Sequence, residues 1–238
     1  MPQTPRIICH RGTCLEAPEN TIVSGHRAIA MGGDWIELDI RQSRDGVLYV
    51  LHDETVDRTT NGTGPLTDMV STDIDQLDAG SWFDPAFAGT TLPRLEPFLA
   101  ELSGVAGGFY LEVKQADCAA IAAVVDRLGL ADRCMTCSFD PQMRQDMARH
   151  APDVAQMVHR ASGDSIDDLA TRHGAAIVEF FAETLNAEEV AECKERGICT
   201  QLWTDRDDPV LFQQAIDLGL DFVNIDHIQQ FKALRDGR

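Results

Sequence analysis

The residues best suited to chemistry lie in one stretch, at positions 35–53. Glu37 and Asp39 are two residues apart in a run with strand character, so the side-chain period of two places both carboxylates on one face. The Asp-Gly pair at 45–46 is a strong hairpin signal, and the apolar run after it predicts a second strand ending at His52. With a suitable hairpin register, an imidazole meets two hard oxygen ligands in one cleft. Such groups suit metal-assisted acid–base chemistry.

Short apolar or β-branched runs alternate with amphipathic stretches along almost the whole chain. Eight runs predict strands: 7–10, 35–40, 109–114, 134–139, 154–158, 176–181, 199–204 and 222–226. Six stretches between them have helical spacing: 21–31, 119–128, 140–149, 166–173, 187–196 and 209–218. In a chain of 238 residues this repetition favours an α/β fold with a closed (β/α)8 barrel of the TIM type over a doubly wound open sheet. We expect a single domain over residues 1–238.

Two features interrupt this regularity. One is the hairpin strand predicted at 47–51, and the other is the stretch 54–92, which is rich in Gly, Thr and Asp and has no clear helix. Because a bare loop of that length would be unusual, we interpret it as a small insertion after the second strand. The carboxyl ends of barrel strands face the active site, so the insertion is expected at that mouth. Trp82, Phe83 and Phe87 are expected to form its core.

The composition limits the partners. The formal net charge is −19, from 20 basic and 39 acidic residues. An acidic surface repels phosphate backbones and anionic lipid, so neither nucleic acid nor stable membrane association is expected. An anionic small-molecule substrate stays open, because a bound divalent cation can reverse the local charge.

Other features of the chain predict a cytoplasmic location. No stretch approaches the roughly 20 apolar residues needed to span a bilayer, and the first residues do not resemble a signal peptide. The cysteine count, 7, is odd and the spacing irregular, as expected for reduced thiols. Cys134 and Cys137 lie within a predicted strand, and we interpret them as buried, apolar side chains rather than a redox or zinc motif.

Polar side chains gather at the ends of the predicted strands, where a barrel enzyme needs them. They are His10 and Arg11 on the first strand, Glu37 and Asp39 on the second, Glu112 and Lys114 on the third, Trp203 on the seventh and Asp226 on the eighth. Three carboxylates without a cysteine or a tight histidine cluster suit Mg²⁺ or Ca²⁺ better than Zn²⁺. Arg11 and Lys114 offer positive charge to a phosphate. Alternatively, these two side chains and the carboxylates form an ion-pair network that needs no metal.

A series of short motifs follows in a fixed order. They are His10-Arg11-Gly12, Pro18-Glu19-Asn20-Thr21, Glu37-Leu38-Asp39, Asp45-Gly46, His52-Asp53, Arg58-Thr59-Thr60-Asn61-Gly62, Leu77-Asp78-Ala79-Gly80-Ser81-Trp82-Phe83, Leu92-Pro93 and Leu111-Glu112-Val113-Lys114. Together they resemble the glycerophosphodiester phosphodiesterase family, a match far more specific than a lone His-Arg-Gly. The family has a TIM-type barrel with an insertion after the second strand, in agreement with the elements expected above.

The resemblance implies metal-dependent hydrolysis of glycerophosphodiesters to glycerol 3-phosphate and an alcohol. By similarity, one divalent cation, Mg²⁺ or Ca²⁺, is held by Glu37, Asp39 and Glu112. His10 and His52 are the general acid and base, in an order that the sequence does not decide. The glycerol hydroxyl next to the phosphate then attacks and gives a cyclic phosphate.

The resemblance weakens at the last two strands. The chain has Trp203-Thr204-Asp205-Arg206 where the family commonly has Trp-Thr-Val-Asn, and Asp226 is retained without its usual Thr neighbour. Trp203 can still pack against the glycerol, but the charged pair leaves the preferred alcohol open. The ion and the oligomeric state are open as well.

Two other functions are weighed against this one. A lysophospholipase D or sphingomyelinase D-type enzyme on the same barrel would need an apolar groove for acyl chains, and the acidic surface argues against lipid docking. A non-catalytic module that binds phosphate and metal would have no use for two histidines.

Several residues near the motifs are given structural roles. Asn20 precedes a helical stretch and is expected to be its N-cap, and Glu19 is expected to orient Arg11. Glu179 and Gln201 lie on predicted strands without an assigned role. Surface or packing roles are expected for the remaining histidines: His26, His150, His159, His173 and His227.

Overall fold

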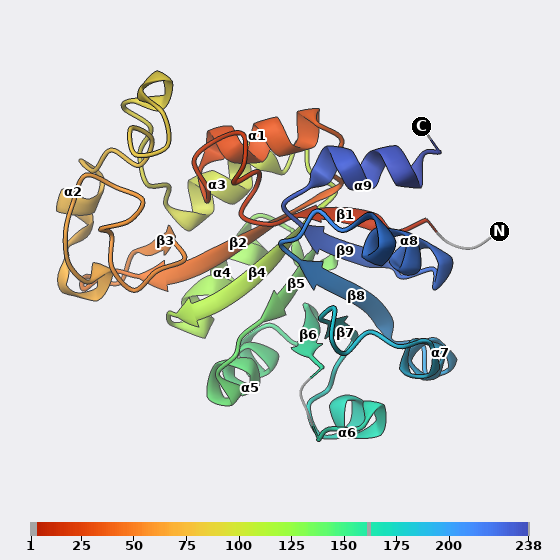
Figure 1. Cartoon of the computed structure of the whole chain (residues 1–238). Coiled ribbons are helices and arrows are strands. Elements are labelled where there is room, and N and C mark those ends of the chain that lie inside the picture. Colours follow the sequence, from red (N-terminus) through yellow and green to blue (C-terminus); the bar gives the residue numbers. More distant parts are fainter. Residues whose placement is uncertain (1–3, 161–162, 238) are drawn as a thin grey trace.

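The computed structural model describes residues 4–160 and 163–237, which form a closed barrel of parallel strands (Figure 1). The barrel strands are β1 (Arg6–Cys9), β2 (Trp35–Gln42), β4 (Gly108–Gln115), β5 (Cys134–Cys137), β6 (Ala155–His159), β7 (Ile177–Phe180), β8 (Cys199–Thr204) and β9 (Phe222–Ile225). They follow one another in chain order, and β1 closes the barrel by pairing with both β2 and β9. The predicted TIM-type barrel is confirmed, and each predicted barrel strand overlaps an observed one.

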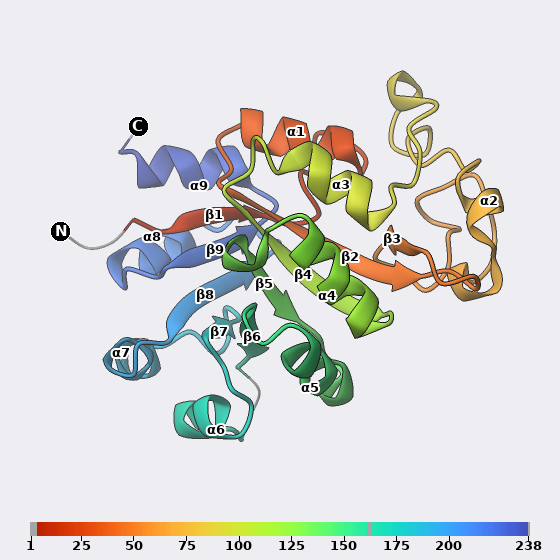
Figure 2. The ribbon, with the colours of Figure 1, turned by 180° about the vertical axis from the view of Figure 1, so that it is seen from behind.

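Helices surround the barrel, as Figures 1 and 2 show from opposite sides. Six correspond to predicted stretches: α1 (Ile22–Ala30), α4 (Cys118–Arg127), α5 (Pro141–His150), α6 (Ile166–Thr171), α7 (Ala187–Glu195) and α8 (Pro209–Asp217). Two further helices are not among the predicted stretches: α3 (Leu95–Leu102) and α9 (Ile228–Arg235). Pro97 obscures α3, yet it lies in the first turn, where a missing N–H costs no hydrogen bond. No helix in residues 4–160 and 163–237 is long and apolar enough to cross a membrane.

The hairpin strand β3 (Leu48–Val50) lies outside the barrel and runs antiparallel to β2. Gly46 in the connecting turn has a φ of 86°, a conformation that favours glycine. The insertion that follows contains the short helix α2 (Ser71–Ile74) and two 3-10 turns, Leu66–Asp68 and Pro85–Phe87. The stretch has no clear helical pattern in the sequence, and α2 is a single turn of α-helix. In Figure 1 the insertion extends away from the barrel beside β3.

The core of the insertion differs from the expected one. Its buried side chains are Tyr49, Leu51, Val56, Leu66, Ile74, Ala79 and Leu92. Trp82 is 37% exposed, and it packs edge-on against Phe83, which packs in the same way against Phe87. The Asp78 carboxylate accepts hydrogen bonds from backbone amides on both sides of these rings, which closes the loop on itself. Trp82 thus lies on the surface of the loop, and the half-buried Phe83 and Phe87 pack beside it rather than in the core.

The barrel interior changes from apolar to polar along the strands. Its lower layer contains Ile8, Tyr110, Met135, Cys137, Met157, Ile177 and Phe222. Since side chains alternate along a strand, the next inward residue on each strand lies two positions further on. Polar residues occupy most of those positions: His10, Glu37, Glu112, His159, Glu179, Gln201 and Asn224. The carboxyl ends of the strands therefore surround a polar chamber.

Candidate active site

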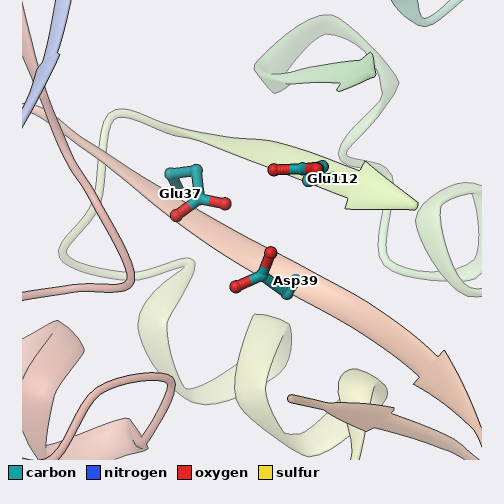
Figure 3. Close-up of side chains that lie close together, drawn as sticks. All are labelled: Glu37, Asp39 and Glu112. Carbon is teal, nitrogen blue, oxygen red and sulfur yellow. The ribbon is translucent and has the colours of Figure 1, made fainter. Parts of the chain in front are cut away.

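Three carboxylates converge inside the barrel. Glu37 and Asp39 extend from β2 toward Glu112 on β4, as Figure 3 shows, and Asp39 lies opposite Glu112 in the strand register. Each residue offers one oxygen, and these oxygens lie within 4.8 Å of one another. All three side chains are buried. The alternation along β2 thus places two carboxylates on one face, as its sequence predicts.

Asp39 and Glu112 have cationic and amide partners. The Lys114 ammonium lies 2.5 Å from Glu112 Oε1 and 3.2 Å from Asp39 Oδ1. Asn20 Nδ2 donates to Asp39 Oδ2 at 2.8 Å, and Arg11 Nε lies 3.5 Å from the same oxygen. Burial raises the pKa of Asp39, but the charges of Lys114 and Arg11 outweigh burial and hold it below its usual range.

Glu37 is less well compensated. Its Oε2 accepts a hydrogen bond from the backbone amide of Arg11 at 2.7 Å, whereas Oε1 is buried without a hydrogen-bond partner in the described chain. Burial and the nearby charge of Asp39 raise the pKa of Glu37 to about 8. A closed ion-pair network would leave no such oxygen, since a buried, unpaired acceptor is costly. Three hard oxygen donors with buried acceptors that lack a hydrogen-bond partner fit a divalent cation, so this cluster could bind a metal.

Two histidines flank the cluster, each held by a carboxylate. His10 Nδ1 lies 2.8 Å from Asp226 Oδ1, and His52 Nδ1 lies 2.6 Å from Asp53 Oδ1. Both contacts fix a ring and leave Nε2 free of these partners. Burial lowers the pKa of His10, but its hydrogen bond to Asp226 and the charges of Glu37 and Asp226 outweigh burial and raise this pKa above its ordinary value.

The backbone around Arg11 is unusual. Arg11 and Asn20 have φ values of 53° and 57°, and the Asn20 amide donates to the Arg11 carbonyl. The expected N-cap is wrong: α1 is capped by Thr21, whose hydroxyl accepts from the Ser24 amide. Asn20 stands one residue earlier, and its left-handed conformation accompanies a side chain that reaches Asp39.

Arg11 is oriented by an acidic neighbour, as expected. Its Nη1 donates to Glu19 Oε1 at 3.0 Å. Arg58, which has no predicted role, donates two hydrogen bonds to the same Glu19 and binds Asp53 as well. Arg58 belongs to one of the motifs that resemble the family, and this is the sequence feature that could have indicated a role at the site.

A cavity of about 200 Å³ adjoins the carboxylate cluster at Glu112. It is lined by His10, Arg11, His52, Tyr110, Glu112, Lys114, Phe139, His159, Glu179, Phe181, Trp203 and Asn224. Trp203 packs edge-on against His10 with ring centroids 5.8 Å apart. Asp205 and Arg206 are both exposed and are not among the lining residues, and Arg206 faces Glu183 at 3.4 Å. The charged pair therefore does not line the cavity.

His159 corrects another expectation. Rather than a surface or packing residue, it lines the cavity, with Nδ1 2.7 Å from Glu179 Oε2 and Nε2 3.0 Å from Cys137 Sγ. Cys137 is buried as expected but has this polar contact. The predicted strand, 154–158, ends one residue too early, because β6 continues to His159. Its inward position then follows from the alternation that places Met157 in the core.

Comparisons with known proteins agree on one family. Residues 10–230 match the model of the glycerophosphoryl diester phosphodiesterase family. The chain is 32% identical over 234 residues to a glycerophosphodiester phosphodiesterase of Caldanaerobacter subterraneus subsp. tengcongensis, covering 92% of this chain and 93% of that protein.

Solved structures extend the similarity to three dimensions. A glycerophosphodiester phosphodiesterase from Agrobacterium tumefaciens superposes with a TM-score of 0.92 at 39% identity, covering 96% of this chain and 99% of that one. A phosphodiesterase from Oleispira antarctica, solved with the product sn-glycerol 3-phosphate, gives a TM-score of 0.89 at 27% identity, covering 98% and 97%.

Proposed function

Because this chain belongs to the glycerophosphoryl diester phosphodiesterase family, we propose that its cavity is where a glycerophosphodiester is hydrolysed to sn-glycerol 3-phosphate and an alcohol. The observation that carries this proposal is the pairing of His10 with Asp226 and of His52 with Asp53 beside one carboxylate cluster. The small cavity volume also favours a compact substrate over an acyl chain, since pockets for drug-sized ligands are typically about 300–1,000 Å³.

The carboxylate cluster is proposed to hold one divalent cation, Mg²⁺ or Ca²⁺. Glu37, Asp39 and Glu112 would be its ligands, because they offer hard oxygens and Glu37 Oε1 has no other partner in the described chain. When bound, the cation offsets negative charge on the phosphoryl oxygens.

Arg11 and Lys114 are proposed to bind the phosphate. Both line the cavity, and both are partly exposed to it. The Arg11 guanidinium is held by Glu19 and can present its remaining N–H groups to phosphoryl oxygens. Lys114 bridges the carboxylate cluster and the cavity, so it also orients Glu112. Trp203 is proposed to pack against the glycerol.

His10 and His52 are proposed to move the protons. One imidazole accepts the proton of the glycerol hydroxyl next to the phosphate as its oxygen bonds to phosphorus, and the other protonates the alcohol oxygen as its bond to phosphorus breaks. Water then opens the cyclic phosphate with the two roles exchanged. The carboxylates on Nδ1 stabilise each imidazolium and fix the ring so that Nε2 faces the reaction.

The test is release of glycerol 3-phosphate from a panel of glycerophosphodiesters with choline, ethanolamine, glycerol or inositol as the alcohol. Release should stop with EDTA and return with Mg²⁺ or Ca²⁺. A diester whose glycerol lacks the adjacent free hydroxyl should remain intact, because it cannot form the ring. Hydrolysis of such a diester would reject the cyclic route. No release from any member with either ion would reject the activity.

A further inference from the structure

One wall of the cavity is built from aromatic rings. We call Phe139, His159, Phe181 and Trp203 the aromatic wall. The His159 ring is stacked on Phe139, with centroids 4.0 Å apart and an interplanar angle of 15°, and on Phe181 at 5.7 Å and 24°. Phe181 then meets Trp203 edge-on at 5.8 Å. This wall lies at the carboxyl ends of β5 to β8: His159 and Trp203 are strand residues, whereas Phe139 and Phe181 follow β5 and β7. It lines the same cavity as Arg11 and the two proposed catalytic histidines, and it adjoins His10 through Trp203.

A buried charge pair lies within this wall. Glu179 is 2% exposed, and its two oxygens face His159 Nδ1 at 2.7 Å and Gln201 Nε2 at 2.6 Å. Burial lowers the pKa of His159, but Cys137 and Glu179 outweigh burial and raise it above its ordinary value. The contact of Nδ1 with the Glu179 carboxylate thus favours the protonated imidazole, whose charge balances that carboxylate. Lys114 adds a second cation, since its Nζ lies 5.8 Å from the centroid of Phe139.

Unused oxygen acceptors lie beside the wall. Gln201 Oε1 and Asn224 Oδ1 are buried, and neither has a hydrogen-bond partner within residues 4–160 and 163–237. Asn224 lines the cavity and is 2% exposed. A buried acceptor without a donor is costly, so a ligand hydroxyl that reaches Asn224 would be favoured.

These features specify the kind of ligand that fits. Ring faces pack against C–H groups, and free acceptors take hydroxyl donors, so together they suit an uncharged polyol. Three aromatic rings around an unpaired carboxylate would instead bind a quaternary ammonium. Here His159 occupies the centre of the wall and cancels the carboxylate. We propose that His159 makes the aromatic wall select an uncharged polyol and reject a quaternary ammonium group.

This inference deepens the proposed function and rests on it for the position of the phosphate. A glycerophosphodiester has two organic arms that could supply the polyol. One is the glycerol present in every substrate, and the other is the released alcohol when that alcohol is glycerol or inositol. The chemistry required of the wall is the same in both cases, and the experiment separates them.

The test compares two phosphomonoesters as ligands. Glycerol 3-phosphate presents a polyol next to its phosphate, and phosphocholine presents a quaternary ammonium, so the ratio of their dissociation constants measures the selectivity directly. The wild-type protein should prefer glycerol 3-phosphate. In His159→Phe the ring stack is retained but Glu179 is unpaired, and the ratio should shift toward phosphocholine by about tenfold or more.

A double variant isolates the cause. In His159→Phe with Glu179→Gln no carboxylate is left, so the shift toward phosphocholine should disappear. His26→Phe is the matched control, because it removes a histidine that lies 3.3 Å from Glu101 on the surface, and its ratio should equal that of the wild type. If His159→Phe does not fold, as judged by circular dichroism, His159→Gln serves, since it also removes the cation.

An unchanged ratio in a folded His159 variant overturns the proposal, and so does a shift that survives Glu179→Gln. Where the ratio shifts as expected, the hydrolysis panel shows which organic arm of the substrate contacts the aromatic wall. A change in the ranking of alcohols assigns the wall to the released alcohol. An equal change in KM for all members assigns it to the glycerol. The binding ratio does not depend on turnover, so a protein that binds selectively but hydrolyses nothing would reject the activity alone.

Discussion

Arg58 and Glu19 are joined by two parallel hydrogen bonds, each 2.8 Å long. The same guanidinium donates to both oxygens of Asp53, at 2.6 and 3.1 Å, and Asp53 holds His52. Glu19 in turn holds Arg11. An arginine of the insertion thus links a proposed acid–base histidine with the proposed phosphate-binding arginine through two carboxylates.

Removing this link should impair turnover more than stability. In Arg58→Ala we expect kcat to fall about 10- to 100-fold, because His52 and Arg11 both lose the partner that fixes their carboxylate. The side chain is 44% exposed, so the loss of ion pairs should change the free energy of unfolding little. Added guanidinium chloride at low concentration should restore part of the activity of Arg58→Ala. Arg172→Ala, which removes an exposed pair with Asp168, is the control and should be unaffected. Wild-type kcat in Arg58→Ala would show that the link has no catalytic role.

Metal binding should be visible as thermal stabilisation. A cation that binds the folded chain at 100 times its Kd adds about 2.7 kcal/mol, which for a chain of this size corresponds to a rise in Tm of about 5–10 °C. Calorimetry with and without Ca²⁺ or Mg²⁺ measures this rise. Asp39→Asn should reduce it strongly. An equal rise in Asp39→Asn would place the cation elsewhere.

Asn20 and Thr21 should have separable roles, although they are adjacent. Asn20→Ala leaves Asp39 without its amide donor, so we expect about 10- to 100-fold weaker metal binding, as is common when a partner of a ligand is lost. Thr21→Ala removes the α1 cap and should cost about 1 kcal/mol of stability without weakening metal binding. Calorimetric titration and denaturant unfolding of both variants give the two quantities. Equal metal affinities would contradict the role of Asn20.

The His10–Asp226 pair predicts a pH-dependent contribution to stability. The folded-state pKa of His10 is above its ordinary value of 6.5, so this contribution is complete below pH 6.5 and is lost as the pH rises through the raised value. Asp226→Asn should therefore lower the free energy of unfolding more at about pH 5.5 than at about pH 9, by an extra 1–3 kcal/mol or so. Urea unfolding at both values measures the difference. If Asp226→Asn lowers the free energy of unfolding equally at both pH values, the contact with Asp226 does not stabilise a protonated His10.

The sequence suffices for the barrel because its strand and helix patterns repeat with few exceptions. The convergence of Glu37 with Asp39 also follows from local alternation. In contrast, the contact of Asn20 with Asp39 depends on a left-handed φ, which the helix-capping pattern hides.

The roles of His159 and Arg58 cannot be predicted from local sequence patterns. His159 acquires its character from Cys137 and Glu179, each about 20 residues away in sequence and on neighbouring strands, so only the assembled sheet brings the three together. Arg58 likewise depends on how the insertion folds back toward Glu19, 39 residues away.

Because β3 lies at the edge of the sheet, the hairpin that holds His52 and the barrel should differ in their resistance to heat and denaturant. His52 is held in place by a short strand with one barrel neighbour, β2, whereas the carboxylate cluster sits on strands paired on both sides. Edge hairpins open at lower free energy than the closed sheet they border. Amide hydrogens of Val50 and Leu51 should therefore exchange with deuterium sooner than those of β4. The enzyme should stop working under conditions in which its barrel is still intact, and inactivation should be reversible on cooling.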